Sequence, residues 1–206
     1  MPVLRNKQTL RLGVFASSRG TDLQAILNAK SRGELPFLDL RLVLSDKEDA
    51  FALERARRAG VKACFLNPKG MNRAAYDKAC LKICQENGVE VIFLIGYMRI
   101  VSSVLIRPFQ GRIFNIHPSL LPKYPGMDLQ VHAEVIRNGE KESGCTLHYV
   151  TEELDGGPVF LQEKVPISEN ETVESLKEKV QLAEQKVLLA ALNQLASQIS
   201  IPVSGL

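Results

Sequence analysis

Short apolar runs alternate, in the first half of the chain, with longer segments whose apolar residues recur every three or four positions. The short runs have the length of β-strands, and the longer segments have the period of amphipathic helices. Residues 89–95 (VEVIFLI) form the most continuously apolar run, as expected of a central parallel strand covered on both faces. The pattern predicts strands at 10–16, 38–44, 61–66 and 89–95, and helices starting near 21 and covering 50–59 and 73–87.

Capping residues support these limits. Asn72 can cap the helix at 73–87, Gly60 suits the position after the helix at 50–59, and Thr21 or Asp22 can cap the first helix. Strands that alternate with helices predict a doubly wound α/β sheet, mostly parallel, with helices on both faces. Ligands of such sheets bind beyond the carboxyl ends of the strands.

The second half of the chain continues the pattern, with a long helix near its end. We predict a helix from 102 or 103 to about 109, a strand at 113–116, a helix at 129–137, strands at 143–150 and 159–165, and a long helix capped by Thr172. The tail at 197–206 is expected to be frayed. Because no repeat or linker is present, we predict a single domain over residues 1–206.

The composition narrows the class of protein. The hydrophobic fraction of 45% and the charged fraction of 24% are those of an ordinary globular protein. A net charge of +3 permits an anionic ligand but does not favour nucleic acid or an anionic membrane. Since no run is long enough to span a bilayer and the N-terminus lacks an apolar signal core, we predict a cytoplasmic protein.

The strongest candidate chemistry lies at residues 111–126 (GRIFNIHPSLLPKYPG). On a strand, Asn115 and His117 project from the same face, and Pro118 ends the strand. An amide and an imidazole held side by side can stabilise an oxyanion and transfer a proton. The alternative is a buried pair of polar residues that only satisfy each other.

Three further segments follow predicted strands. Residues 17–21 form a strand–loop–helix junction at which backbone N–H groups can hold a phosphate, although it is not a GxGxxG motif. Residues 96–101 form either the wall of a ligand pocket or a plain connector. In the acidic turn at 151–158, Asp155 is fixed by the Gly-Gly-Pro that follows, whereas acidic turns are usually only solvated.

The remaining histidines and the cysteines suggest structural roles. His132 is most simply a surface side chain, and His148 is more often structural than catalytic at such a position. The four cysteines lack paired CxxC spacing, so we expect reduced, mostly buried thiols and no zinc site.

Residues 115–122 (NIHPSLLP), followed by Asp155-Gly156-Gly157-Pro158, resemble the folate-dependent formyltransferases. Segments 22–26, 51–56, 96–100 and 123–126 also match, and the resemblance extends from residue 12 to about residue 195. It is greatest to the branch of the family that acts on glycinamide ribonucleotide in purine synthesis. The resemblance implies formyl transfer from 10-formyltetrahydrofolate to the amine of that ribonucleotide without a metal, and antiparallel strands near the C-terminal part of the sheet.

The resemblance also implies roles by position. The catalytic residues would be Asn115, His117 and Asp155, with Asp155 orienting His117. The folate-binding residues would be Met98, Arg99, Ile100, Val101, Arg112, Asn115, Val150 and Asp155. The ribonucleotide-binding residues would be Ser18, Arg19, Gly20, Thr21, Asp22, Arg73, Gln181 and Glu184. Residues 10–110 would form a nucleotide-binding half, and residues 111–200 a folate-binding and catalytic part.

Two departures from the family pattern bear on the substrate. The family's phosphate loop is commonly Gly-Asn-Gly-Ser-Asn, whereas the matching residues here are Ser18-Arg19-Gly20-Thr21-Asp22. Asp22 therefore places a carboxylate near a phosphate, and Arg19 could offset it. The segment at 127–132 is longer than usual and lacks a frequent histidine.

Other functions remain open at this point. A methionyl-tRNA formyltransferase would carry an RNA-binding domain and a formyltetrahydrofolate hydrolase a regulatory domain, and 206 residues leave room for neither. A non-catalytic folate-binding protein would not need Asn115, His117 and Asp155 together. We expect two small-molecule partners, no nucleic acid or membrane partner, and a monomer or homodimer.

Overall fold

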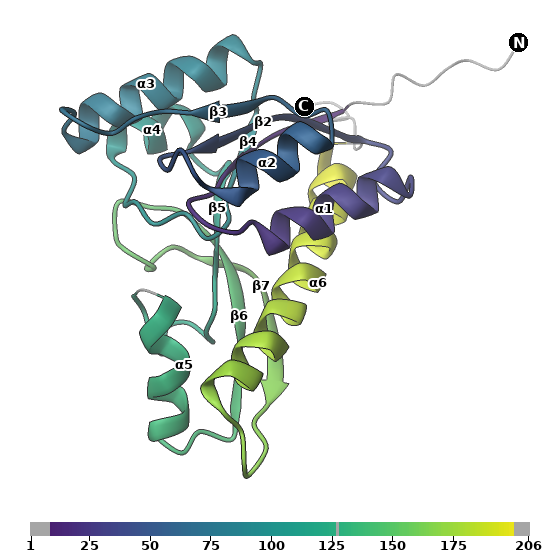
Figure 1. Ribbon diagram of the computed structural model, residues 1–206, viewed down its shortest axis with the longest axis vertical. Coiled ribbons are helices and arrows are strands. Elements are labelled where there is room, and N and C mark those ends of the chain that lie inside the picture. Colours follow the sequence, from purple (N-terminus) through teal and green to yellow (C-terminus); the bar gives the residue numbers. More distant parts are fainter. Residues whose placement is uncertain (1–8, 127, 200–206) are drawn as a thin grey trace, which may run out of the picture.

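The computed structural model describes residues 9–126 and 128–199, and a seven-stranded sheet runs through them (Figure 1). The order of the strands is β3-β2-β1-β4-β5-β6-β7. The strands are β1 (Leu10–Phe15), β2 (Leu38–Ser45), β3 (Ala63–Phe65), β4 (Val91–Leu94), β5 (Ile113–His117), β6 (Glu142–Tyr149) and β7 (Val159–Pro166). The first five strands pair in parallel, and β5–β6 and β6–β7 are antiparallel. The predicted mostly parallel sheet with antiparallel C-terminal strands is confirmed.

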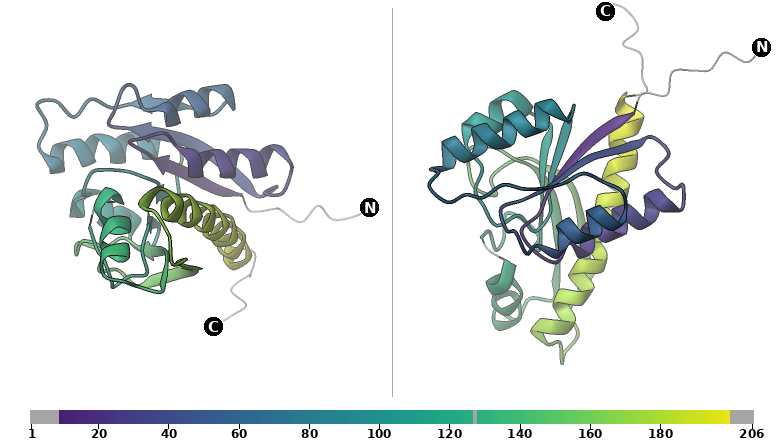
Figure 2. Two further views of the ribbon diagram at one scale, coloured as in Figure 1. Left: turned by 60° about the horizontal axis from the view of Figure 1, so that its bottom comes forward. Right: turned by 45° about the horizontal axis from the view of Figure 1, so that its top comes forward.

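The helices cover both faces of the sheet. They are α1 (Thr21–Ser31), α2 (Phe51–Arg58), α3 (Arg73–Glu86), α4 (Ser103–Ile106), α5 (Asp128–Arg137) and α6 (Val173–Ile199), with a 3₁₀ turn η1 at Arg107–Phe109. Buried side chains of α1, α2, α5 and α6 pack in one cluster against one face of the sheet. Those of α3 and α4 pack in a second cluster against the other face of the sheet. Figures 1 and 2 show α1 and α6 side by side, although they lie at opposite ends of the sequence.

Most of the predicted helix ends are confirmed, and one cap is wrong. The backbone N–H of Ala75 donates to the Asn72 side chain, and that of Ser175 donates to Thr172, as predicted. Helix α1 instead has Gly20 as its N-cap, with φ 66° and no side-chain hydrogen bond. Gly20 is needed there because a Cβ would lie 2.8 Å from the Cβ of Ala52 on α2.

Three predicted limits differ from the structure. Strand β3 has only three residues, and the helix predicted up to residue 109 divides into α4 and η1 where Pro108 removes a backbone donor. Helix α6 continues to Ile199, so fraying from Ser197 is wrong for Ser197–Ile199. The rest of that tail lies outside the described residues. No helix among the described residues is long and apolar enough to cross a membrane.

The order of the strands places the ligand crevice. Strand β1 lies between β2 and β4, because the chain runs outward from β1 through β2 to β3 and then crosses back to β4 and continues in the other direction. The loops after β1 and β4 meet at this reversal, where the N–H of Ser17 donates to the carbonyl of Gly96 at 3.0 Å. Doubly wound sheets bind ligands at this position.

Candidate active site

Strand β5 carries two of the predicted catalytic side chains at its carboxyl end. In the antiparallel register with β6, Asn115 lies opposite His148, and His117 lies opposite Thr146. His117 and His148 are only 3% and 2% exposed. Directly opposed residues on neighbouring strands have adjacent side chains, so the register brings His148 to Asn115.

His148 fixes the amide of Asn115. The His148 Nδ1–H donates to the carbonyl of Tyr149 at 3.0 Å, which leaves Nε2 as an acceptor for the Asn115 Nδ2–H at 3.1 Å. This arrangement needs a neutral ring. Burial lowers the pKa of His148 below its ordinary value of 6.5, and the Tyr149 carbonyl partly offsets this effect. His148 therefore belongs to the site, which the sequence did not indicate.

Asp155 reaches the same place from the turn after β6. It has a left-handed conformation, with φ 51°, and its side chain is 7% exposed. Its Oδ2 accepts the Gly126 N–H at 3.0 Å and lies 3.8 Å from His117 Nδ1, and its Oδ1 lies 3.6 Å from His148 Nε2. Gly157 allows this turn, since a Cβ there would lie 1.8 Å from the Tyr149 carbonyl oxygen.

The other nitrogen of His117 is already occupied. The His117 Nε2–H donates to the carbonyl of Tyr124 at 2.8 Å. Nδ1 therefore faces the Asp155 carboxylate, across a gap too long for a direct hydrogen bond. Nδ1 is the ring nitrogen that can engage another group.

The loop after β1 meets α6, as the predicted ribonucleotide set requires. The Gln181 side chain on α6 donates to the hydroxyl of Thr21 in the first turn of α1. Asp22 and Glu184 are 8% and 9% exposed, and both carboxylates raise the pKa of the nearby Cys145 thiol, after burial as the main cause. Ser18, by contrast, is exposed.

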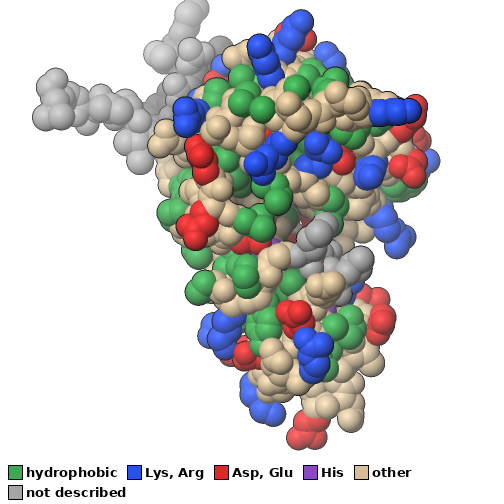
Figure 3. Space-filling view, turned by 90° about the vertical axis from the view of Figure 1, so that its left-hand side faces the viewer, with side chains coloured by type: hydrophobic (Ala, Val, Ile, Leu, Met, Phe, Trp, Pro, Cys, Tyr) green, Lys and Arg blue, Asp and Glu red, His purple; other side chains and the backbone are tan. Residues whose placement is uncertain are grey.

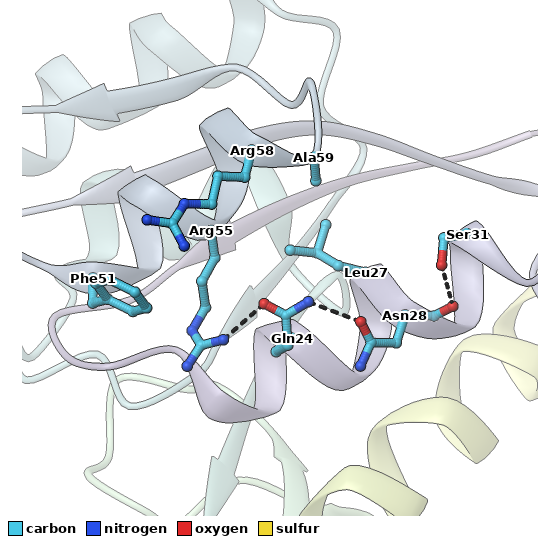
Figure 4. A pocket seen from close by; sticks show the side chains of 8 residues that line it. All are labelled: Gln24, Leu27, Asn28, Ser31, Phe51, Arg55, Arg58 and Ala59. Carbon is cyan, nitrogen blue, oxygen red and sulfur yellow. Dashed lines mark hydrogen bonds between the residues drawn. The ribbon is translucent and has the colours of Figure 1, made fainter.

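Helix α2 holds the backbone of this loop, including that of Arg19, whose side chain is exposed. The Ala52 N–H donates to the Ser18 carbonyl at 3.2 Å, and the Arg55 Nε–H donates to the Arg19 carbonyl at 2.8 Å. Arg55 also donates to Gln24 across a groove of about 230 Å³ between α1 and α2 (Figure 4). The Arg55 guanidinium thus uses Nε and Nη1 to tie the loop after β1 and helix α1 to helix α2.

The predicted folate set divides into three groups. Met98, Arg99 and Ile100 line a pocket of about 350 Å³, and Arg73 lines the same pocket. Val101 and Val150 are packed in the cluster beneath it. Arg73 therefore shares a pocket with three residues of the predicted folate set and does not take part in the contact between Thr21 and Gln181.

Arg112 is separated from this set. Its guanidinium donates to the carbonyls of Pro108 and Glu90 and lies over the Phe109 ring, before the start of β4 and β5. The predicted catalytic residues Asn115 and His117 lie toward the carboxyl end of β5. Strand β5 therefore separates Arg112 from His117.

One hydroxyl joins the loops that follow β1 and β4. The Ser17 Oγ–H donates to Asp46 at 2.5 Å, and the same oxygen accepts the Met98 N–H at 2.9 Å. The Ser17 hydroxyl thus ties the loop after β4 to the loop after β1 and to the residue that follows β2. In Figure 3 the molecule narrows below the part that carries most of the visible Lys and Arg side chains, and histidine side chains are visible in the narrowing.

Two predictions about histidine and cysteine have clear outcomes. His132 is 2% exposed, so its prediction as a surface side chain is wrong: it lies on α5 beside Val131 and Val135, which face the core. The thiols are free, and three of the four are buried. The extension predicted at 127–132 begins at residue 127, which lies outside the described residues, whereas α5 covers the positions from Asp128 onward.

A family model described as formyl transferase matches residues 10–192. The chain belongs to this family. It is 40% identical, over 86% of its length and 83% of the relative's, to the phosphoribosylglycinamide formyltransferase of Escherichia coli K12. Among solved structures, glycinamide ribonucleotide transformylase 1 from Symbiobacterium toebii matches with a TM-score of 0.90 and 38% identity over 99% of this chain and 95% of that one.

Longer members of the family also match. The chain is 38% identical, over 91% of its length, to the trifunctional purine biosynthetic protein adenosine-3 of Bos taurus, and it spans 18% of that protein. The conserved fold in the solved relatives and the family match agree with the formyltransferase fold found here.

Proposed function

We propose that this member of the formyltransferase family transfers a formyl group from 10-formyltetrahydrofolate to the amine of glycinamide ribonucleotide. The observation that carries the proposal is the meeting of Asn115, His117 and Asp155 around His148 in a polar cluster at the carboxyl end of β5. The names of the relatives at 40% and 38% identity support the substrate.

The proposed reaction is an acyl transfer. The amine nitrogen attacks the formyl carbon and forms a C–N bond, and the carbonyl oxygen becomes an oxyanion. The bond from that carbon to N10 of the folate then breaks, and the proton lost by the amine reaches N10. Each step needs a donor for the oxyanion and a carrier for the proton.

The hydrogen bonds assign these tasks to atoms. Asn115 uses one Nδ2–H on His148, and its second Nδ2–H can donate to the oxyanion. His117 is held by Nε2, so that Nδ1–H can act on the reacting atoms while Asp155 stabilises the charged ring. Asp155 is also the nearest carboxylate through which the proton can pass, directly or by water.

On the folate side, the pocket lined by Arg73, Met98, Arg99 and Ile100 suits a planar ring with an anionic tail. Met98 and Ile100 are 43% and 52% exposed and offer apolar surface. We assign Arg73 to the glutamate carboxylates of the folate rather than to the ribonucleotide, because an arginine pairs readily with carboxylates. Val101, Val150 and the turn of Asp155 would form the inner wall.

On the ribonucleotide side, the N–H groups of the loop before α1 would hold the phosphate. Thr21 and Gln181 are already in contact, and Glu184 lies one turn further along α6, where its carboxylate suits ribose hydroxyls. In this arrangement Arg73 and Met98 of the first half serve the folate, while Gln181 and Glu184 of the second part serve the nucleotide. The residues before and after position 110 would therefore both contribute to the folate site and to the ribonucleotide site. A cytoplasmic location and a monomer or homodimer stay predictions.

A steady-state assay with three alternative acceptors tests the proposal. The protein is supplied with 10-formyltetrahydrofolate and with glycinamide ribonucleotide, water alone, or methionyl-tRNA. We expect formylation of the ribonucleotide alone. Equal folate turnover in water would indicate a hydrolase, formylated methionyl-tRNA would indicate the tRNA enzyme, and no turnover with measurable folate binding would indicate a binding protein.

A further inference from the structure

Tyr124 links the catalytic histidine to the surface on the far side of its loop. Its backbone carbonyl accepts from His117 Nε2–H at 2.8 Å and from the Ser119 hydroxyl at 3.1 Å. Its phenol donates to Glu140 Oε1 at 2.9 Å and accepts from the Asn138 Nδ2–H at 3.0 Å. One residue thus holds His117 with its backbone and is itself held through its side chain.

The backbone conformation of Tyr124 makes this link consequential. Its φ is 54°, in the left-handed region that a bulky L-residue rarely adopts because of steric strain. Such a conformation persists only where its surroundings impose it. The phenol contacts with Glu140 and Asn138 lie at the junction of α5 and β6, outside the loop, and are suited to imposing it.

Glu140 is a well-defined acceptor for the phenol. Lys123, first, and then the phenol hold the pKa of Glu140 below its ordinary value, so that the carboxylate is ionised at neutral pH. Lys123 contacts both carboxylate oxygens, at 3.1 and 3.2 Å. Replacing Lys123 would remove the positive charge beside Glu140 but leave the hydrogen bond from the Tyr124 phenol to Glu140.

We propose that Tyr124, anchored by Glu140 through its hydroxyl, is a positioning residue that sets the ring orientation of His117. The role in turnover rests on the proposed function. When the anchor is lost, the Tyr124 backbone can relax from its left-handed conformation, and its carbonyl turns away from His117 Nε2–H. The ring then loses the constraint that directs Nδ1 toward Asp155 and the reacting atoms.

Four single variants and one double variant test the anchor through kinetics. Tyr124→Phe removes only the hydroxyl, and Glu140→Ala removes its acceptor, so each is expected to lower kcat about 10-fold while both KM values stay nearly unchanged. Combining the two should cost no more than either alone, because they break one link. Glu140→Gln keeps an acceptor oxygen and should restore kcat. Lys123→Gln is the matched control, with kcat expected within about twofold of wild type.

The imidazole itself provides a readout that needs no turnover. The chain has three histidines, so ¹⁵N-histidine labelling gives three ring systems, which His132→Gln and His148→Gln assign to their residues. In the wild type, the His117 ring should show a protected Nε2–H proton. In Tyr124→Phe and Glu140→Ala this proton should exchange faster, and in Glu140→Gln and Lys123→Gln it should stay protected.

The two readouts distinguish the possible failures. If His117 keeps a protected Nε2–H and kcat keeps its wild-type value in Tyr124→Phe and Glu140→Ala, the anchor does not position the ring. If kcat falls equally in Lys123→Gln, the effect belongs to the charge of Glu140 and the proposal is wrong. Should the wild type lack formyl transfer, the proposed function fails, while the histidine spectra still test the link between Tyr124 and His117.

Discussion

The two sides of the crevice are built differently. At the ends of β5 and β6, His117 and His148 are almost fully buried; both ring nitrogens of His148 are hydrogen-bonded, and His117 is held through Nε2. After β1, Ser18 and Arg19 have exposed side chains, and the structure holds their backbone carbonyls from α2. The first region therefore has the fixed side chains that proton transfer requires, and the second has exposed side chains that a ligand can contact.

This contrast predicts different kinetic effects. A side chain that acts only on the reacting atoms should change kcat, whereas one that holds both the substrate and the transition state should change KM. Variants at the end of β5 should therefore differ in kind from variants at Arg73 or in the loop after β1.

The largest effect is expected for His117→Ala. Loss of a positioned donor and proton carrier should lower kcat at least about 100-fold, with the fold retained. Steady-state kinetics with both substrates and a thermal melt measure this. Wild-type turnover in the folded variant would remove His117 from the chemistry and break the contrast between the two regions.

Arg73→Ala tests the boundary between the two binding sites. Loss of an arginine–carboxylate pair should raise KM for 10-formyltetrahydrofolate about 10-fold and leave KM for the ribonucleotide nearly unchanged. Arg112→Ala is the matched control, because that guanidinium binds backbone carbonyls at the other end of β5, and both KM values should stay close to wild type. A rise in KM for the ribonucleotide with Arg73→Ala would return Arg73 to the nucleotide site.

Asp22→Asn sharpens the account of the loop after β1. A carboxylate in the first turn of α1 competes with the substrate phosphate for the positive end of the helix, so its neutral isostere should lower KM for the ribonucleotide about fivefold. Asp39→Asn, a half-exposed carboxylate paired with Arg41, serves as the control and should change neither constant. An unchanged or higher KM in Asp22→Asn would show that the carboxylate helps to hold the substrate or the loop.

The smallest effect is a pH dependence of stability at His148. Burial lowers the pKa of His148 in the folded state, so its contribution is fully present above the ordinary value of 6.5 and is lost as the pH falls through the folded value. Thermal melts from about pH 7 to about pH 5 should show a steeper loss of Tm for wild type than for His148→Gln. Parallel curves would mean that the ring is not held neutral.

The parallel part of the sheet and the shared face of Asn115 and His117 were accessible from the sequence because both follow from periodicity. Residues 89–95 indicated a buried central strand, and alternation on a strand placed Asn115 and His117 on the same face. The Gly-Gly-Pro after Asp155 indicated a fixed carboxylate, and Gly157 does permit a close approach to β6. Local rules were sufficient for these features, whereas the link between Asp155 and His117 was implied by the family resemblance.

The missed features depend on contacts between distant segments. His148 joins Asn115 through the register of β5 with β6, and the sequence carried one usable signal, the placement of Thr146 and His148 on the same face of a strand. The N-cap of α1 was wrong because tight packing of Gly20 on Ala52, rather than side-chain capping, sets the start of the helix. Arg112 is close to His117 in sequence but lies before the start of β5, because position along the strand decides which end of the sheet a side chain reaches.

The most direct test of the catalytic assignment is single-turnover formyl transfer by Asp155→Asn, with the affinities for both substrates measured on the same preparation. The substitution keeps the shape of the side chain but removes the charge beside His117 Nδ1. We predict that formyl transfer slows by about 100-fold or more while both affinities stay near wild type. Wild-type transfer at unchanged affinity would contradict the assignment of Asn115, His117 and Asp155 as the groups that carry out the reaction.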